Sequence, residues 1–534
     1  MKLKLESLKN NSIWENAGFQ LPKFDIEGIR LETKKSPTWI HFGAGNIFRA
    51  LMANAQQELL NRGISNKGIV VVGGESIDTI YRAHDNLTVL VTLKSDGSIE
   101  KTVIGSIAES LILDIEREID WNRLKEIFAS PSLQMVSFTI TEKGYSLKDS
   151  RGEFLADVIE DFKKGPQSPK SYIGKIVSLL YERYLYGKKP VAMVSMDNMS
   201  ENGAKLYASV RTITRAWVSK TFVDREFEAY IDNPDLVSFP STMIDKITPS
   251  PNPRVRAMLR EVGFEDVEDV ITSRGSFVSP FVNAEELEYL VIEDVFPNGR
   301  PELEKGGIIF TDRETVAKVE KMKVSTCLNP LHTSLAIFGC LLGYNLISEE
   351  MKDPELRTLV EKIGYEEGFP VVVDPGIIDP KLFIDQVIQI RFPNPFVPDT
   401  PQRIATDTSQ KLGVRFGETI KSYVARNDLN VRDLVFIPLV IAGWCRYLLG
   451  VDDEGNTMEI SPDPLLEELL PHFSDISLGD KGPFEKELGP ILSNRHIFGL
   501  DLYQIGLGKT VENFFAELVS GKGAVRKTLK KYLY

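Results

Sequence analysis

In the first half of this chain, short apolar runs alternate with amphipathic helical patterns. The runs lie at 39–42, 68–72, 135–140 and 190–194, and a helical pattern from Ile47 to Asn61 follows the first of them. Strands that are apolar on both faces need helices on both faces, as in a parallel, doubly wound sheet. We therefore predict an α/β fold for this half.

The second half has a different pattern. A proline-rich segment at 248–253 should be crossed by neither a helix nor a central strand. Beyond about residue 323 the apolar spacing is mainly helical, for example at 331–342, 432–449 and 511–534. We predict two domains, a doubly wound sheet domain at 1–315 and a mainly α-helical domain at 316–534.

Charge and composition exclude several classes of function. The 534 residues carry 63 Lys and Arg against 76 Asp and Glu, a net charge of −13, which argues against nucleic acid and anionic membrane surfaces. An anionic substrate would therefore need local cations. Three cysteines without C-x-x-C spacing and five scattered histidines predict no disulfide framework and no clustered metal site. A polar N-terminus and the lack of a membrane-length apolar run favour a cytoplasmic protein.

A glycine turn follows the first apolar run and precedes the helical pattern. Gly43 would permit a tight turn, and Gly45 would let a pyrophosphate approach the backbone at the helix N-terminus. The third glycine of a dinucleotide-binding turn is missing, because Phe48 stands there. Two glycines can also serve the backbone alone. We favour dinucleotide binding, with candidate contacts at Gly43, Ala44, Gly45, Asn46, Ile47 and Phe48.

An acidic residue, Glu75, stands just after the second apolar run, 32 residues beyond Gly43. A carboxylate there can accept hydrogen bonds from the adenosine ribose and would repel a 2′-phosphate. The alternative is a solvated loop carboxylate. The pairing with the glycine turn favours NAD as the cofactor.

Several segments, taken together in order and spacing, resemble the long-chain polyol-specific (mannitol) dehydrogenase family. The resemblance covers roughly residues 38 to 450, and its segments are 43–50, 139–145, 197–203, 244–249, 320–323, 329–332, 391–395, 403–407 and 442–448. It implies a Rossmann-type domain, a helical domain and an active site between them. It also implies metal-independent hydride transfer between NAD and a secondary alcohol, and it adds Thr141 to the cofactor contacts.

The resemblance assigns the acid/base role to Lys323, with Glu320 as a proton relay to solvent. A lysine can remove the alcohol proton only when it is neutral, so burial or a nearby cation must favour that form. The alternatives are a solvated lysine and a helix-surface carboxylate. If the register is wrong, Lys321 is the rival lysine.

Two asparagines and a histidine complete the implied catalytic set. Asn198 and Asn329 would donate hydrogen bonds to the developing alkoxide, and His332 would bind a neighbouring substrate hydroxyl. The alternatives are a turn residue for Asn198, a helix N-cap for Asn329 and a core histidine for His332. One departure stands out: five residues separate Lys323 from Asn329, whereas the family usually has four. A bulge or helix break would have to absorb the extra residue.

At the far end of the substrate, the resemblance implies contacts from Arg403 and Lys411, with Arg391 as a less certain alternative. They would bind hydroxyls of a polyol or pair with the carboxylate of a hexuronate; ordinary surface ion pairs are the alternative. Overall likeness favours a reductase that interconverts D-fructuronate and D-mannonate, acting as a monomer or small homo-oligomer. Tagaturonate reduction, mannitol 2-dehydrogenation and a catalytically inactive nucleotide-binding sensor remain alternatives.

Overall fold

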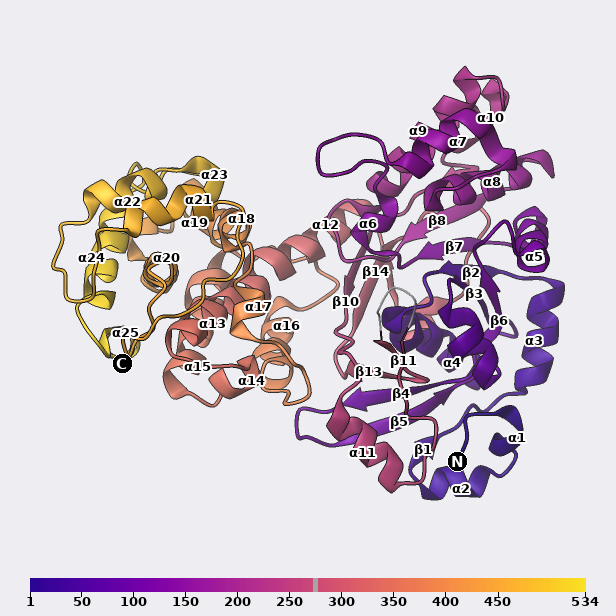
Figure 1. Ribbon diagram of the computed structural model, residues 1–534, viewed down its shortest axis with the longest axis horizontal. Helices are drawn as coiled ribbons and strands as arrows, with labels where there is room; N and C mark the ends of the chain where they lie inside the picture. Colours follow the sequence, from indigo (N-terminus) through magenta and orange to yellow (C-terminus); the bar gives the residue numbers. More distant parts are fainter. Residues whose placement is uncertain (272–276) are drawn as a thin grey trace. The chain divides into compact units, whose positions relative to one another are not determined.

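The computed structural model describes residues 1–271 and 277–534 (Figure 1). The chain folds into two compact units. The first comprises residues 1–94 and 98–316, and the second comprises residues 95–97 and 317–534. The boundary falls inside helix α12 (Arg313–Met322).

A six-stranded parallel sheet forms the centre of the first unit, in the order β6-β3-β2-β7-β8-β9. In chain order this is 3-2-1-4-5-6, the order of dinucleotide-binding doubly wound sheets. The α/β prediction for this half is therefore confirmed. The strands are β2 (Trp39–Phe42), β3 (Ile69–Gly73), β6 (Ile107–Ile112), β7 (Met135–Phe138), β8 (Val191–Ser195) and β9 (Val237–Ser238).

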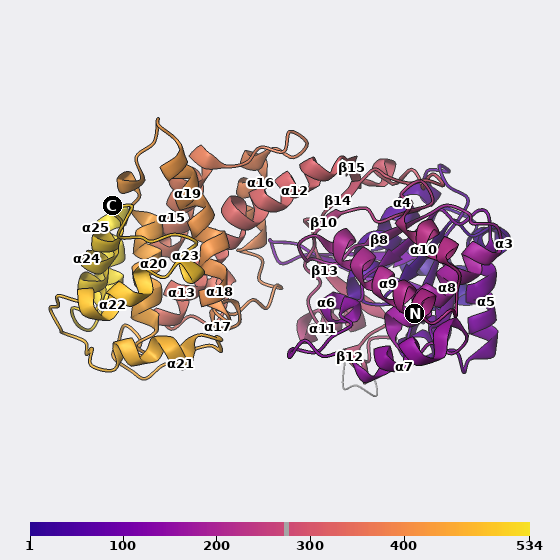
Figure 2. The same cartoon turned by 90° about the horizontal axis from the view of Figure 1, so that it is seen from above.

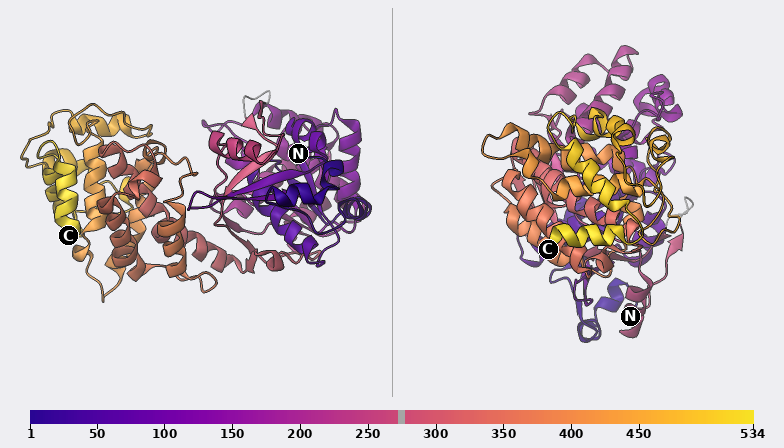
Figure 3. Two further views of the ribbon diagram at one scale, coloured as in Figure 1. Left: turned by 90° about the horizontal axis from the view of Figure 1, so that it is seen from below. Right: turned by 90° about the vertical axis from the view of Figure 1, so that its left-hand side faces the viewer.

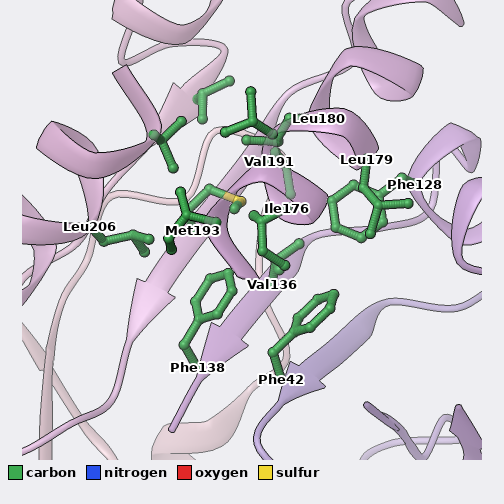
Figure 4. Close-up of a cluster of buried hydrophobic side chains, with 14 of the residues drawn as sticks. Phe42, Phe128, Val136, Phe138, Ile176, Leu179, Leu180, Val191, Met193 and Leu206 are labelled. Atoms are coloured by element: carbon green, nitrogen blue, oxygen red, sulfur yellow. The ribbon is translucent and has the colours of Figure 1, made fainter. Parts of the chain in front are cut away.

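Both faces of this sheet are buried, as the apolar runs require. Phe42, Phe138 and Met193 pack with side chains of the covering helices in one core cluster (Figure 4). Trp39 and Val71 belong to a second cluster. The main helices of this unit are α3 (Ile26–Lys35), α4 (Ala53–Asn61), α5 (Glu118–Ala129), α7 (Ala156–Lys164), α8 (Tyr172–Leu185), α9 (Asn202–Ser219), α10 (Arg225–Asp232) and α11 (Pro253–Glu261).

Besides a short two-stranded sheet, two larger sheets were not predicted. One has the order β1-β5-β4-β13, with β4 and β5 as an antiparallel hairpin (Figure 3); the other has the order β10-β14-β15. Neither a strand nor a helix crosses the proline-rich segment, as expected. The strands are β1 (Phe19–Gln20), β4 (Thr88–Leu93), β5 (Ile99–Ile104), β13 (Phe281–Glu285), β10 (Thr242–Asp245), β14 (Tyr289–Glu293) and β15 (Ile309–Thr311), with a short antiparallel pair of β11 (Val270–Ile271) and β12 (Phe277–Val278).

The second unit, all of whose residues are described, contains helices and no extended strand, which confirms the predicted helical half. Helix α20 is buried along its length and packs against α13 and α24 (Figure 2). The helical stretch 313–341 is long and apolar enough to span a membrane, but 83% of its apolar window is buried, as in a core helix. The main helices are α13 (Asn329–Leu341), α15 (Pro354–Glu361), α16 (Pro380–Gln386), α17 (Pro401–Ile404), α18 (Thr408–Leu412), α19 (Glu418–Ala425), α20 (Phe436–Tyr447), α22 (Glu485–Leu492), α24 (Gly508–Leu518) and α25 (Ala524–Leu533), with π-helical turns η6 (Lys323–Cys327), η9 (Val387–Arg391) and η10 (Gly413–Gly417).

Candidate functional site

The glycine turn lies where the strand order of the central sheet reverses, between β2 and β7. Gly43 has a φ of 124°, and a Cβ atom on it would lie 2.1 Å from the carbonyl oxygen of Thr139, the residue that follows β7. Only glycine fits there. A crevice at the carboxyl ends of strands at such a reversal is where open α/β sheets bind nucleotides.

Gly45 has the opposite environment. It is exposed, and a Cβ atom on it would meet no described atom within 4 Å. The helical backbone begins directly after it, at Asn46, whose Oδ1 accepts a 2.7 Å hydrogen bond from Arg49. Ala44 is fixed through its carbonyl oxygen, which accepts a 3.0 Å hydrogen bond from the Tyr81 hydroxyl. The turn is held from behind and open in front, so its residues fit a pyrophosphate.

Phe48, which replaces the third glycine, is a core residue. Its ring is fully buried and stacks on the His41 ring, with centroids 4.5 Å apart and planes at 15°. The helix starts with a π-helical turn, η1 (Phe48–Met52), which precedes α4. Ile47 packs at the edge of the same core cluster. Any cofactor contact by Phe48 must therefore come from its backbone.

His41 belongs to a hydrogen-bond chain that ends on the glycine turn. Trp39 Nε1 donates to Ser137 Oγ at 2.7 Å, and Ser137 Oγ lies 2.7 Å from His41 Nδ1. His41 Nε2 lies 2.8 Å from Thr139 Oγ1, and the Thr139 hydroxyl donates to the Gly43 carbonyl at 3.3 Å. Because Thr139 gives its proton to a carbonyl, His41 must donate through Nε2 and accept through Nδ1. The hydrogen bonds therefore all run in one direction, from Trp39 to His41 and on to Gly43, and they require a neutral imidazole.

This burial predicts an acid-sensitive contribution to stability. Burial lowers the pKa of His41 to about 3, whereas it is near 6.5 in the unfolded chain, so the folded state resists protonation. As the pH decreases below 6.5, the free energy of unfolding of the wild type should decrease by about 1.4 kcal/mol per pH unit because of this residue alone. The variant His41→Phe lacks that term. Urea unfolding of both proteins between pH 7 and 4 checks this, and parallel pH curves would contradict it.

The turn after β7 is fixed by Asp197, which follows β8. Its carboxylate accepts hydrogen bonds from the backbone N–H groups of Ile140 (2.8 Å) and Thr141 (3.1 Å) and from the Tyr145 hydroxyl (2.6 Å). Burial raises the pKa of Asp197, and these three donors oppose the rise. Thr141, exposed and with a φ of 62°, is thereby held in a strained conformation beside the sheet reversal. Asn198, the next residue along the chain, is exposed at the same edge.

Glu75 lies two residues beyond the end of β3 and is exposed. The carboxyl end of this strand neighbours that of β2, because the two strands pair in parallel. The position is the one expected for an acidic residue that binds a ribose.

In the second unit, Lys323 is buried, with 4% of its surface exposed. It begins the π-helical turn η6, and the N–H of Leu328 donates to its carbonyl at 3.1 Å across five residues. A π-helical turn holds one residue more than an α-helical one. The extra residue between Lys323 and Asn329 is absorbed in this way.

The neighbouring charged residues differ from Lys323 in exposure. Lys321, the rival lysine, has 49% of its side chain exposed and pairs with Glu418 at 3.4 Å. Glu320, one turn before Lys323, is half-buried. Among these lysines, only Lys323 has the burial that the acid/base role requires.

Asn329 and His332 project from the start of α13. The helix begins at Asn329 itself, with Leu328 as the N-cap, so Asn329 is not the cap residue. Its amide makes no hydrogen bond to another described residue. His332 Nε2 is buried without hydrogen-bond geometry to the described chain and lies 3.4 Å from Asp399 Oδ2. Burial lowers the pKa of His332 against the effect of Asp399. A buried ring nitrogen without a hydrogen-bond partner, three residues after a partly exposed amide on the same helix, suits a ligand with hydroxyls.

The cations expected at the far end of the substrate lie in different surroundings. Arg403 has 62% of its side chain exposed and pairs with Asp399. Lys411 donates to the carbonyl of Thr406, and burial, with the nearby Arg415, lowers its pKa. Arg391 is buried in η9. Arg415 and Arg403 both act electrostatically on Lys411, so these three cations form one group around Lys411.

Sequence reasoning missed His41, Asp197, Asp399 and Arg415. Each lies far in sequence from the residue that it contacts, so no local sequence motif identifies it. For Asp197 a signal existed, because it directly precedes Asn198 inside one of the segments that carry the resemblance. In the described residues, no group of three or more His, Cys, Asp or Glu residues could hold a metal ion.

Comparisons with known proteins extend over the whole chain. Residues 37–305 match the mannitol dehydrogenase Rossmann domain, and residues 315–518 match the mannitol dehydrogenase C-terminal domain. A D-mannonate oxidoreductase of Thermotoga maritima is 52% identical over 99% of each chain. A substrate-free D-sorbitol dehydrogenase structure matches with a TM-score of 0.78 and 26% identity, over 95% of this chain and 97% of that one. A Pseudomonas fluorescens mannitol 2-dehydrogenase, in a ternary complex with NAD and D-mannitol, matches with a TM-score of 0.68 and 28% identity, over 100% and 99%.

Proposed function

The chain belongs to the mannitol dehydrogenase family, and from this premise we propose that it is an NAD-dependent oxidoreductase that interconverts D-mannonate and D-fructuronate. The full-length identity of 52% to a D-mannonate oxidoreductase supports this substrate pair over the others of the family. The observation that carries the reaction type is the buried Lys323 six residues before Asn329, whose amide makes no hydrogen bond to the described chain.

The first unit would hold the cofactor. Gly43, Gly45 and the helix start at Asn46 would take the pyrophosphate, Glu75 the adenosine ribose, and the turn at Thr141 the part nearer the reaction. The exposed glycine, the strained turns and the strand order fit such a group. When bound, NAD accepts or supplies the hydride.

The second unit would handle the proton and the oxygen. Lys323 takes the proton of the substrate hydroxyl during oxidation and returns it to the carbonyl oxygen during reduction. Asn329 donates a hydrogen bond to that oxygen as charge develops, and Asn198 of the first unit is a second candidate donor. His332, which its lowered pKa keeps neutral, can hydrogen-bond a neighbouring hydroxyl through Nε2. Glu320 would pass the proton of Lys323 to solvent.

A spectroscopic assay tests the proposal. Purified protein would be mixed with NADH and, separately, D-fructuronate, D-tagaturonate and D-fructose, in the presence of EDTA. We expect rapid loss of NADH absorbance with D-fructuronate. Turnover of D-tagaturonate or of D-fructose alone would assign that compound as the substrate instead of D-fructuronate. No turnover with any of them would contradict the enzyme assignment.

The non-catalytic alternative has lost its support. It depended on the extra residue after Lys323, which the π-helical turn accommodates while Lys323 stays buried. A cytoplasmic location and a monomeric or small homo-oligomeric state remain predictions. The substrate is a small molecule, a polyol or a sugar acid.

Coenzyme choice should depend on Glu75. Replacing it by serine removes hydrogen bonds to the ribose, which should lower kcat/KM for NADH by about tenfold, and it removes the repulsion of a 2′-phosphate, so the NADPH/NADH ratio should rise. Asp78→Ser is the matched control, because this nearby carboxylate instead pairs with Arg82 at 2.8 Å. Steady-state kinetics with both coenzymes would decide, and equal ratios in the two variants would refute the role.

A further inference from the structure

Arg415, on the π-helical turn η10, is half-buried and has fewer hydrogen-bond partners than the fully buried Arg183 and Arg446. Arg183 donates to five backbone carbonyls, and Arg446 donates to three. The guanidinium of Arg415 makes a single hydrogen bond to the described chain, from Nη1 to the Thr333 hydroxyl. A guanidinium has five N–H donors, so most of those of Arg415 have no protein acceptor.

The unused donors of Arg415 are not sealed inside the protein. None of its nitrogens is among the buried unpaired side-chain atoms of the described residues, and the residue is half-buried. Among the described residues, no carboxylate lies within 4.0 Å of it. Burial alone lowers its pKa to about 10, so Arg415 is still a cation at neutral pH. A partly desolvated cation with no carboxylate beside it favours an anionic partner.

The position of Arg415 connects it with the reaction site of the second unit. The turn η10 packs against η6, which carries Lys323, and against α13. Its partner Thr333 follows His332, whose pKa Arg415 also helps to lower. Arg415 is therefore anchored to the helix that holds the proposed hydroxyl-binding residue.

The other cations near Arg415 are already engaged. Arg403 pairs with Asp399. Lys411 donates a hydrogen bond to a backbone carbonyl, and the negative charges of Asp407 and Asp463 stabilise its ammonium form. Of the three cations in this group, only Arg415 has no carboxylate acting on it in the described chain.

We propose that Arg415 binds the carboxylate of the sugar-acid substrate and is the residue that distinguishes a hexuronate from a neutral ketose or polyol. The planar fork of a guanidinium gives a carboxylate two parallel hydrogen bonds. A neutral sugar would leave the desolvated cation uncompensated, which penalises its binding. This inference rests on the proposed function, because it assumes a sugar-acid substrate.

A substrate pair that differs only at the carboxylate tests the inference. D-Fructose has a CH₂OH group where D-fructuronate has its carboxylate. In Arg415→Gln, kcat/KM for D-fructuronate should fall by about 100-fold or more, while that for D-fructose should stay the same or rise. Arg415→Lys keeps the charge but not the fork, so its loss should be intermediate. Arg357→Gln, the control at an exposed arginine that pairs with Glu361 at 3.0 Å, should leave the substrate ratio unchanged.

The outcomes separate this inference from the proposed function. An equal loss for both substrates in Arg415→Gln would mean a merely structural role, and an unchanged D-fructuronate value would also overturn the inference. If Arg415→Gln fails to fold, the ratio in Arg415→Lys decides, and a ratio equal to that of the wild type overturns it. Failure of the proposed function would appear in the wild-type protein itself, as no turnover of D-fructuronate.

Discussion

The variant Lys323→Ala should retain the fold and NADH binding but lose turnover. General acid/base groups contribute about 10²- to 10⁴-fold to rate, so we expect kcat for D-fructuronate reduction to fall by that range. Loss of the amine leaves no described group of comparable burial and basicity on η6, whose other residues are Val324, Ser325, Thr326 and Cys327. Steady-state and single-turnover kinetics would measure the effect.

Two further variants protect this prediction against a folding artefact. Lys323→Met keeps the apolar stem that packs in the core, so it should be as stable as the wild type and as inactive as the alanine variant. Lys321→Ala removes an exposed amine two residues away and should leave kcat unchanged. An active Lys323→Met, or an inactive Lys321→Ala, would move the acid/base role away from Lys323.

Periodicity and turn chemistry were sufficient to predict the helical half and four of the six strands of the central sheet, but not β6 and β9. Each run of apolar residues that was assigned to a strand became one, with its bounds shifted by no more than two residues. Such runs are easy to recognise because burial on both faces makes most of their positions apolar. The glycine turn was predictable for a similar reason, since Gly43 needs a backbone conformation that other residues avoid.

The additional sheets were missed although one local signal was present. Asp96-Gly97 separates β4 from β5, and this dipeptide is typical of a tight hairpin. Other features had no local signal. Whether the extra residue after Lys323 would form a bulge or a break depends on how η6 packs against η10 and neighbouring helices, which only the folded chain determines.

Pairs of residues distant in sequence were the least predictable part of the candidate site. Asp399 lies 67 positions beyond His332, and Arg415 reaches Thr333 across 82 positions. A resemblance identifies residue types that a family shares, but the partners that orient or leave free a given side chain follow from the tertiary fold. Arg403 illustrates this point: its predicted contact with the substrate stays a prediction, while its pairing with Asp399 is visible only in the folded chain.

The largest structural effect is expected at the glycine turn. Gly43→Ala would force a φ of 124° on alanine and place its methyl group 2.1 Å from the carbonyl oxygen of Thr139. Strain and clash together should lower the free energy of unfolding by about 2–4 kcal/mol. The shift of the turn needed to relieve the clash would also disturb its N–H groups, so the Kd for NADH should rise by more than about tenfold.

Gly45→Ala separates backbone strain from obstruction of the cofactor. It adds the same methyl group two residues after Gly43, at a position where φ is not positive. Nothing described lies within 4 Å of the added carbon, so thermal denaturation should match the wild type. If the open side of Gly45 receives the pyrophosphate, the methyl group must still weaken NADH binding, measured by fluorescence titration. Loss of affinity in both variants but of stability only in Gly43→Ala would follow from the proposed geometry, whereas undiminished affinity in Gly45→Ala would place the cofactor elsewhere.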